Sequence, residues 1–123
     1  MERGQRMDQE LMKRRTREFA GHIVGFCRQL PQTREGRLLG NQLFRSGTSV
    51  GANYRAACRG RSRADFISKL GIALEEADET LYWLELLQDA RVVKPEIAAT
   101  LAKEASELVA ILVATLNTAK RNS

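Results

Sequence analysis

Hydrophobic residues recur along the chain at the three- and four-residue spacing that places them on one face of an α-helix. Four blocks show this pattern, over about residues 8–30, 34–59, 63–90 and 95–120. No stretch alternates for long enough to predict a β-strand. Four helices of similar length with short connections favour an antiparallel up-down four-helix bundle. We therefore expect an all-α chain in which residues 1–123 form a single domain.

The breaks between the blocks carry helix-ending and helix-capping residues. Pro31 ends the first block, and Thr33 is suited to cap the second helix. Ser62 is the expected cap of the third helix, and Asp65 three residues later completes a weak capping box. Pro95 suits the first turn of the fourth helix.

Three of the blocks carry a continuous apolar stripe, which we predict to form the core. These stripes comprise Met12, Phe19, Ile23, Phe26 and Leu30 in the first block, Phe66, Leu70, Ala73, Leu74, Ala77, Leu81 and Leu84 in the third, and Ile97, Leu101, Ala105, Leu108, Leu112 and Ala119 in the fourth.

The second block differs, because its core face changes from leucine to small and polar residues. This face comprises Leu39, Leu43, Ser46, Ser49, Val50, Asn53 and Ala57. Small side chains let another helix approach closely, and a buried Asn53 must find hydrogen-bond partners. We interpret Ser46, Ser49 and Asn53 as structural polar residues that fix helix register, since a small-molecule or metal pocket would need ligands that this face lacks.

The opposite face of the second block is rich in arginine. Arginines separated by small residues present rows of forked donors to phosphate or carboxylate oxygens. A solvated face and a face that meets an acidic surface of another subunit are the alternative interpretations. With the basic cluster of the first block, the predicted nucleic-acid-binding residues are Lys13, Arg14, Arg15, Arg17, Arg45, Arg55, Arg59, Arg61 and Arg63.

The third block has a second outward surface that is acidic and aromatic. A single subunit would expose its aromatic residues as an apolar patch, and such patches mark interaction sites. An acidic-aromatic face that meets a basic face makes a head-to-tail contact, and such contacts can close into a ring. The predicted oligomer interface comprises Glu75, Glu79, Tyr82, Trp83 and Leu86.

Charge is distributed unevenly along the 123 residues, whose net charge is +5. Residues 1–63 carry 14 Lys and Arg against 5 Asp and Glu, whereas residues 64–123 carry 6 against 10. This asymmetry favours an anionic partner or a contact between unlike halves of two subunits. No apolar run approaches the roughly 20 residues of a membrane span, and the charged N-terminal segment lacks the apolar core of a signal peptide. We expect a soluble cytoplasmic protein without a membrane partner.

Residues for catalysis or metal binding are scarce. Cys27 and Cys58 are expected to be free thiols, and His22 is the only histidine. Di-iron bundles combine core carboxylates with Glu-x-x-His motifs, but Glu75 and Glu79 project away from the predicted core and His22 has no such glutamate. We expect no enzyme activity, no metal and no cofactor.

Residues 42–87, QLFRSGTSVGANYRAACRGRSRADFISKLGIALEEADETLYWLELL, closely resemble the four-helix-bundle proteins encoded within intervening sequences of bacterial 23S rRNA genes. The resemblance rests on Arg-Ser-x-x-Ser-Val-x-Ala-Asn from Arg45, on Ser-x-x-Asp-Phe from Ser62 and on Tyr-Trp-Leu from Tyr82. It implies an antiparallel bundle that assembles into a ring-shaped homopentamer with a basic surface. It also suggests kinship with the accessory protein of diversity-generating retroelements, which binds reverse transcriptase and nucleic acid. Ala56 and Ala57 stand where that family often has an acidic residue, which makes this face more basic.

Two functions follow from these patterns. The first is a non-enzymatic oligomeric protein that binds structured RNA, or another nucleic acid, through phosphate contacts that carry little sequence information. The alternative is a protein-interaction scaffold or accessory subunit, for example of a reverse transcriptase, whose basic ring surface contacts a protein partner.

Overall fold

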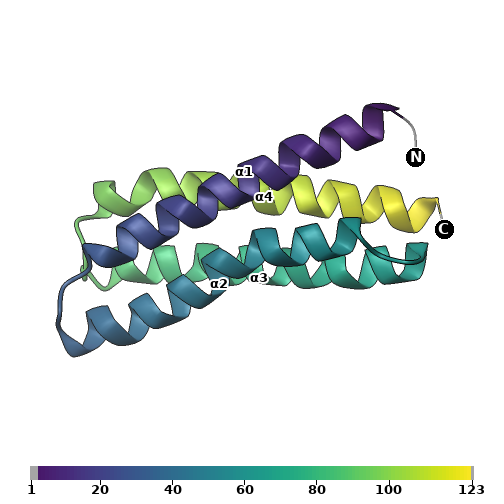
Figure 1. Ribbon diagram of the computed structural model, residues 1–123. Coiled ribbons are helices and arrows are strands. Elements are labelled where there is room, and N and C mark those ends of the chain that lie inside the picture. Colours follow the sequence, from purple (N-terminus) through teal and green to yellow (C-terminus); the bar gives the residue numbers. More distant parts are fainter. Residues whose placement is uncertain (1–2, 123) are drawn as a thin grey trace.

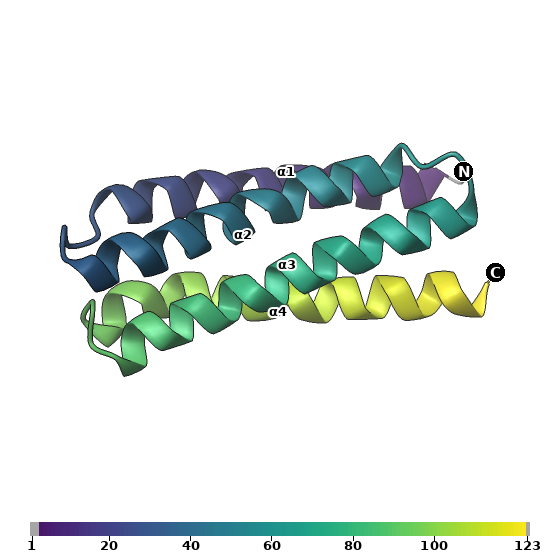
Figure 2. The same ribbon diagram turned by 90° about the horizontal axis from the view of Figure 1, so that it is seen from below.

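The computed structural model describes residues 3–122 as four helices: α1 (Arg3–Arg28), α2 (Arg34–Cys58), α3 (Arg63–Asp89) and α4 (Pro95–Arg121). Consecutive helices run in opposite directions, so both chain termini and the α2–α3 connection lie at one end (Figures 1 and 2). The predicted all-α four-helix bundle is confirmed, with no strand within these residues. α1 begins five residues earlier than the apolar pattern predicts, because residues 3–7 (Arg, Gly, Gln, Arg and Met) hold a single large apolar residue and add little to that pattern. Within the described chain, no helix is both long and apolar enough to cross a membrane.

The predicted N-caps of α2 and α3 are confirmed. Thr33 Oγ1 accepts a hydrogen bond from the Gly36 amide at 3.1 Å, and Ser62 Oγ accepts one from the Asp65 amide at 3.1 Å. Asp65 departs from the predicted capping box, because its Oδ2 accepts from the amide of Arg61 at 3.2 Å and not from that of Ser62. This backbone hydrogen bond lowers the pKa of Asp65. Both caps satisfy amide groups that a helix start leaves without partners.

The end of α3 is a Schellman motif with arginine at the position that usually holds glycine. Arg91 has a φ of 54°, its amide donates to the Gln88 carbonyl at 3.0 Å, and the Val92 amide donates to the Leu87 carbonyl at 3.1 Å. Val92 packs against the core and Leu87 is fully buried. The packing of Val92 against the core stabilises a turn that the arginine backbone adopts at a cost of about 1–2 kcal/mol.

The core follows the predicted stripes with one displacement. Most predicted positions are buried or half-buried. Ile97, however, is 54% exposed and Ala98 is buried in its place, so the prediction for the start of α4 is wrong by one position. Tyr54 and Leu87 are buried core residues outside the predicted stripes. Tyr54 can be buried in the core because the ring of tyrosine is apolar.

Glycines on α2 bring its backbone close to α1. A Cβ on Gly47 would lie 2.8 Å from Cγ1 and Cγ2 of Ile23, and one on Gly51 would lie 3.0 Å from Oγ1 of Thr16. Gly40 meets Leu30 in the same way, at 2.9 Å. Glycine inside a helix costs about 0.5–1 kcal/mol relative to alanine, so these residues are explained by the close approach that they permit.

α1 makes a much looser contact with α4. The two helices diverge towards the chain termini (Figure 1), and the described ion pairs between them come from Arg15. Arg15 binds Glu104 through Nε and Nη2 at 2.8 and 2.7 Å, and its Nη2 lies 2.9 Å from Glu107. The hydrogen bonds to Glu104 are the main reason that the pKa of Arg15 is raised above its usual value.

Candidate nucleic-acid interface

Positive charge gathers at one end of the bundle. Residues 8–15, 47–76 and 108–122 form the half that holds both termini and the α2–α3 connection, which we call the termini half (Figure 1). They carry 10 Lys and Arg against 5 Asp and Glu, a net charge of +5. Residues 16–46 and 77–107 form the other half and carry 8 against 9, a net charge of −1. The uneven distribution of charge along the sequence therefore becomes a difference in net charge between the two ends of the folded bundle.

Five of the predicted nucleic-acid-binding residues have exposed side chains without an ion pair within residues 3–122: Arg14, Arg17, Arg55, Arg59 and Arg61. An arginine that is not bound to a carboxylate keeps its whole fork of donors for an incoming oxyanion. We call these residues the free arginines. Arg14, Arg55, Arg59 and Arg61 belong to the termini half, and Arg17 is two residues beyond the boundary of that half at Arg15.

The α1–α2 contact brings the basic residues of the two helices together. Because Thr16 lies against Gly51 and the helices are antiparallel, Arg17 and Arg55 lie on neighbouring helices within about one helical turn of this contact, to either side of it along the axis. Lys13 forms a 3.0 Å ion pair with Glu10 within α1.

The thiol of Cys58 lies near both charges of the Lys13–Glu10 ion pair. Burial is the main cause that raises its pKa, the hydrogen bond with Tyr54 and the charge of Lys13 lower the pKa, and the charge of Glu10 raises it. Lys13 is thus close to the end of α2, where Arg59 begins the connection to α3. The outer surface of α1, α2 and the α2–α3 connection therefore carries the free arginines together with the exposed acids Asp8, Glu10 and Glu18.

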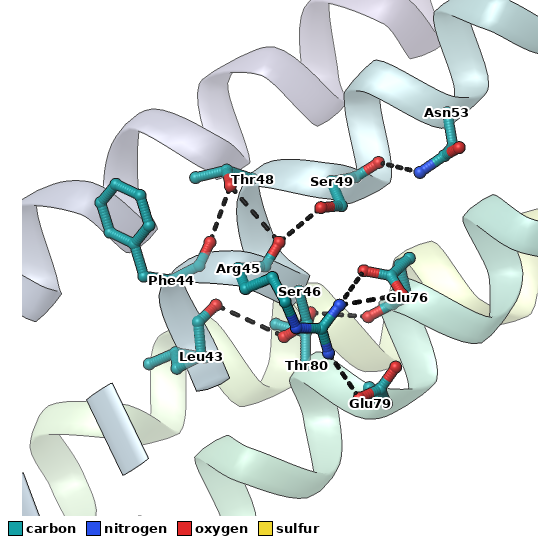
Figure 3. Close-up of polar contacts among 10 residues, drawn as sticks. All are labelled: Leu43, Phe44, Arg45, Ser46, Thr48, Ser49, Asn53, Glu76, Glu79 and Thr80. Carbon is teal, nitrogen blue, oxygen red and sulfur yellow. Dashed lines mark hydrogen bonds and ion pairs between the residues drawn. The ribbon is translucent and has the colours of Figure 1, made fainter. Parts of the chain in front are cut away.

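Three other predicted nucleic-acid-binding residues are engaged inside the subunit. Arg15 is bound to α4 as described, and Arg63 Nη1 donates to the Ala119 carbonyl at 3.3 Å, which satisfies an acceptor at the end of α4. Arg45 Nη1 donates to Glu76 at 3.1 Å and its Nη2 donates to Glu79 at 2.7 Å (Figure 3). These carboxylates raise the pKa of Arg45, with the charge of Glu76 as the largest cause.

The structural polar residues of α2 divide into one contact between helices and two contacts within α2. Thr80 Oγ1 on α3 donates to Ser46 Oγ at 3.0 Å, and both side chains are fully buried (Figure 3). Ser49 Oγ instead donates to the Arg45 carbonyl at 2.5 Å, and Asn53 Nδ2 donates to the Ser49 carbonyl at 2.9 Å. The expectation of a buried Asn53 is wrong: it is half-buried and bonds its own helix, so Ser46 is the one of these three polar residues that bonds to α3.

The predicted oligomer interface on α3 is only partly exposed. Tyr82 is 56% exposed, and its ring meets that of Trp83 edge to face, with centroids 5.1 Å apart and an interplanar angle of 74°. Trp83 and Leu86 are half-buried, and Trp83 packs against the core of its own subunit. The expectation that a single subunit exposes Trp83 as part of an apolar patch is therefore wrong. Glu79 is engaged by Arg45 and is half-buried.

The outward face of α3 is more acidic than the prediction recognised. Glu75, Asp78, Glu85 and Asp89 are exposed around Tyr82, and no ion pair engages them within residues 3–122. Their spacing of three, seven and four residues places them along one helix face. The same periodicity that located Glu75 and Tyr82 would have located the other three. We call this set the acidic face of α3.

Nothing within residues 3–122 forms a cluster of three or more His, Cys, Asp or Glu that could hold a metal ion. Cys27 and Cys58 are free. Burial raises the pKa of Cys27 to about 11, so this thiol is protonated and weakly nucleophilic at neutral pH.

Comparisons with known proteins agree with this architecture. The model of the family described as 23S rRNA-intervening sequence protein matches residues 9–114. The chain is similar to a protein of unknown function from the S23 ribosomal protein family of Bacteroides thetaiotaomicron, whose crystal structure has been solved. The two sequences are 38% identical, and the two structures superpose with a TM-score of 0.82. The match covers 89% of this chain and 97% of that one. The comparison with curated proteins found no match. With four antiparallel helices and a family match over most of its length, the chain belongs to the 23S rRNA-intervening sequence protein family.

Proposed function

We propose that this chain is a non-enzymatic, self-associating protein that binds structured RNA through the free arginines of α1, α2 and the α2–α3 connection, with little sequence specificity. The observation that carries the proposal is the set of five exposed arginines without a carboxylate partner in the described chain, on or beside a half with a net charge of +5. Guanidinium groups bind phosphate oxygens through paired hydrogen bonds. Phosphate contacts supply affinity and leave sequence unread.

Salt dependence is the physical signature of this mode of binding. Each neutralised phosphate releases condensed counterion, so the logarithm of the association constant falls with the logarithm of salt concentration by about 0.7–0.9 per contact. Five free arginines that each contact one phosphate predict a slope of about −3.5 to −4.5. A scaffold that binds proteins through the same surface would bind RNA weakly at every salt concentration.

The test compares two triple variants that remove the same number of positive charges. Arg55→Ala, Arg59→Ala and Arg61→Ala combined remove free arginines from the basic surface, whereas Arg28→Ala, Arg34→Ala and Lys94→Ala combined remove exposed cations at the opposite end. Fluorescence anisotropy of a labelled RNA hairpin, titrated at several salt concentrations, gives the affinity and the slope. We expect the first variant to bind at least about tenfold more weakly and to lose about 2–3 units of slope.

The control variant is expected to stay within about twofold of the unmodified protein at low salt, since its charges lie away from the proposed contact. Equal losses in the two variants would mean that only net charge matters. A slope near zero for the unmodified protein would contradict RNA binding and favour the scaffold.

Self-association is proposed to join the acidic face of α3 to exposed cations of the next subunit other than the free arginines, which stay open to RNA. The support is that the acidic face keeps unpaired charges within one subunit while the chain has a net charge of +5, which favours a head-to-tail contact. Five subunits in a ring are the expected number, as the family resemblance implies. Light scattering on Glu75→Lys combined with Glu85→Lys should show a lower mass than the unmodified protein. Both positions are exposed, so the fold should persist, and a monomeric mass for the unmodified protein would refute the contact.

A further inference from the structure

The divergence of α1 from α4 leaves a groove of about 820 Å³ at the end where the chain termini lie. Its walls are the first half of α1 and the second half of α4, and its floor is the end of α2 and the start of α3. In a closed four-helix bundle this space would be filled by contacts between the first and fourth helices. Here it stays open, and Leu11 in its wall is 55% exposed.

The lining of the groove is mainly apolar, and its small residues would let another helix come close to α4. Leu11, Tyr54, Phe66 and Ile111 supply large apolar surface from four different helices. The wall on α4 has small residues, among them Ala114, and small side chains let the backbone of another helix come near. Residues 111–122, from α4 and its C-cap, border the groove over about 18 Å, or roughly three helical turns.

Charge around the groove selects the kind of partner. Arg63 lines it and uses one of its donors on the Ala119 carbonyl, while Arg61 and Arg121 lie nearby at the same end of the bundle. The other lining arginine, Arg15, is balanced by its two glutamates on α4. Asp8 is the one acidic residue of the lining. An occupant with acidic side chains beside its apolar face would therefore be favoured over a basic one.

A second copy of this chain offers no helix face that matches the groove. Within the described residues, the exposed large hydrophobic side chains are distributed over all four helices, and no two on one helix are three, four or seven residues apart. They are Leu11, Leu38, Phe44, Ile72, Tyr82, Ile97 and Val113. An amphipathic helix binds in a groove through residues at i, i+3, i+4 and i+7. Another protein is therefore the better source of a helix with an exposed apolar stripe.

We propose that the groove between α1 and α4 is a docking site for a helix of about three turns from a protein partner, with an apolar stripe on one face and acidic residues beside it. The helix completes the open side of the bundle, and its acidic residues lie towards Arg63. None of the free arginines lines the groove, and the test measures peptide binding, so its outcome does not depend on whether the protein binds RNA.

The experiment uses a fluorescent 15-residue peptide with leucines at i, i+3, i+4, i+7 and i+11 and glutamates at most other positions, together with a copy in which lysines replace the glutamates. Ala114→Trp fills the groove from an exposed position, and Ala99→Trp places the same side chain at an exposed position of α4 outside the lining. Thr118→Trp, also exposed and in the lining, is a second blocking variant. Circular dichroism confirms that each variant is helical.

We expect the full-length protein to bind the glutamate peptide, and the Ala114→Trp and Thr118→Trp variants to bind it at least about tenfold more weakly. The Ala99→Trp variant should bind within about twofold of the unmodified protein. The lysine peptide should bind the unmodified protein at least about tenfold more weakly than the glutamate peptide does.

Three results would overturn the proposal. The first is unchanged affinity for the glutamate peptide in both blocking variants. The second is equal affinity for the lysine peptide, which would show that the surrounding charge selects nothing. The third is an unmodified protein that does not bind the peptide while Ala114→Trp lowers its oligomeric mass, because a second copy would then cover the groove.

Discussion

α1 is held by its two neighbours in opposite ways. Against α2 it packs through glycines that let Ile23 reach the backbone of the facing helix, and Ile23 is fully buried. Against α4 it is held by the ion pairs of Arg15, while Leu11 remains mostly exposed. Burying a large aliphatic side chain contributes about 1.5–3 kcal/mol, whereas an exposed ion pair contributes about 0–1 kcal/mol. A helix can therefore belong to a bundle firmly on one side and leave the other side available for a partner.

The largest expected effect comes from shortening one apolar side chain of α1 on the face towards α2 and, in a second variant, one on the face towards α4. Ile23→Ala should lower the free energy of unfolding by about 3–4 kcal/mol, because it removes a fully buried side chain and leaves a cavity. Leu11→Ala should cost less than about 0.5 kcal/mol, because this residue is mostly exposed. Urea unfolding measures both values. Similar losses for the two variants would contradict the difference between the two contacts.

Adding a methyl group at a glycine in the contact between α1 and α2 should have the next largest effect. Gly47→Ala gains about 1 kcal/mol of helix propensity, but its Cβ would lie 2.8 Å from Ile23, and such overpacking costs about 1–3 kcal/mol. We expect a net loss of about 1 kcal/mol in urea unfolding. The matched control is Gly71→Ala on α3, where a Cβ has no neighbour within 4 Å. The control should gain about 0.5–1 kcal/mol, and an equal gain at Gly47 would show that the contact is not tight.

Removing the ion pairs to α4 should be a smaller change with a local effect. Arg15→Met should lower the free energy of unfolding by no more than about 1 kcal/mol, and by less at high salt, because the groups are partly exposed. Amide hydrogen exchange should become faster in residues 8–15 of α1 and stay unchanged around Ile23. Faster exchange along the whole of α1 would mean that Arg15 holds the entire helix.

The last expected effect, which appears only at alkaline pH, is a loss of stability caused by Cys27 in the contact between α1 and α2. Cys27 lies in this contact, with its Sγ 3.7 Å from the Gly40 carbonyl oxygen, and burial raises its pKa from 9.0 to about 11. The unfolded chain releases this proton at lower pH than the folded chain does, so stability is unaffected below pH 9 and falls as the pH rises from 9 to 11. Cys27→Ala should reduce that decline in denaturation measured across this range. An identical decline in the variant would assign it to other groups.

Sequence patterns predicted the helices, the caps and most of the core, because each depends on residues close together in the chain. Thr33 and Ser62 cap the helices that follow them directly, and the apolar periodicity of α3 reports one helix face. The failures concern positions where the periodicity is ambiguous. At the start of α4, Ile97 and Ala98 both fit an apolar stripe, and the structure buries the smaller one.

The candidate site was less predictable, because its residues are sorted by contacts between helices. Arg45 and Arg55 look equivalent on one face of α2, yet Arg45 is bound by Glu76 and Glu79 and Arg55 is not. That difference depends on how α2 and α3 are aligned, which helical periodicity does not contain. The same applies to Trp83, whose burial depends on the distance between helices.

Trp83 is the only tryptophan of the chain, and its indole Nε1 is buried without a hydrogen-bond partner in the described structure. Its intrinsic fluorescence therefore arises from one place, beside the acidic face of α3. Unfolding hydrates the indole and should move its emission to longer wavelength. The same emission, followed while the protein is diluted, should also report whether neighbouring subunits separate, without any label attached.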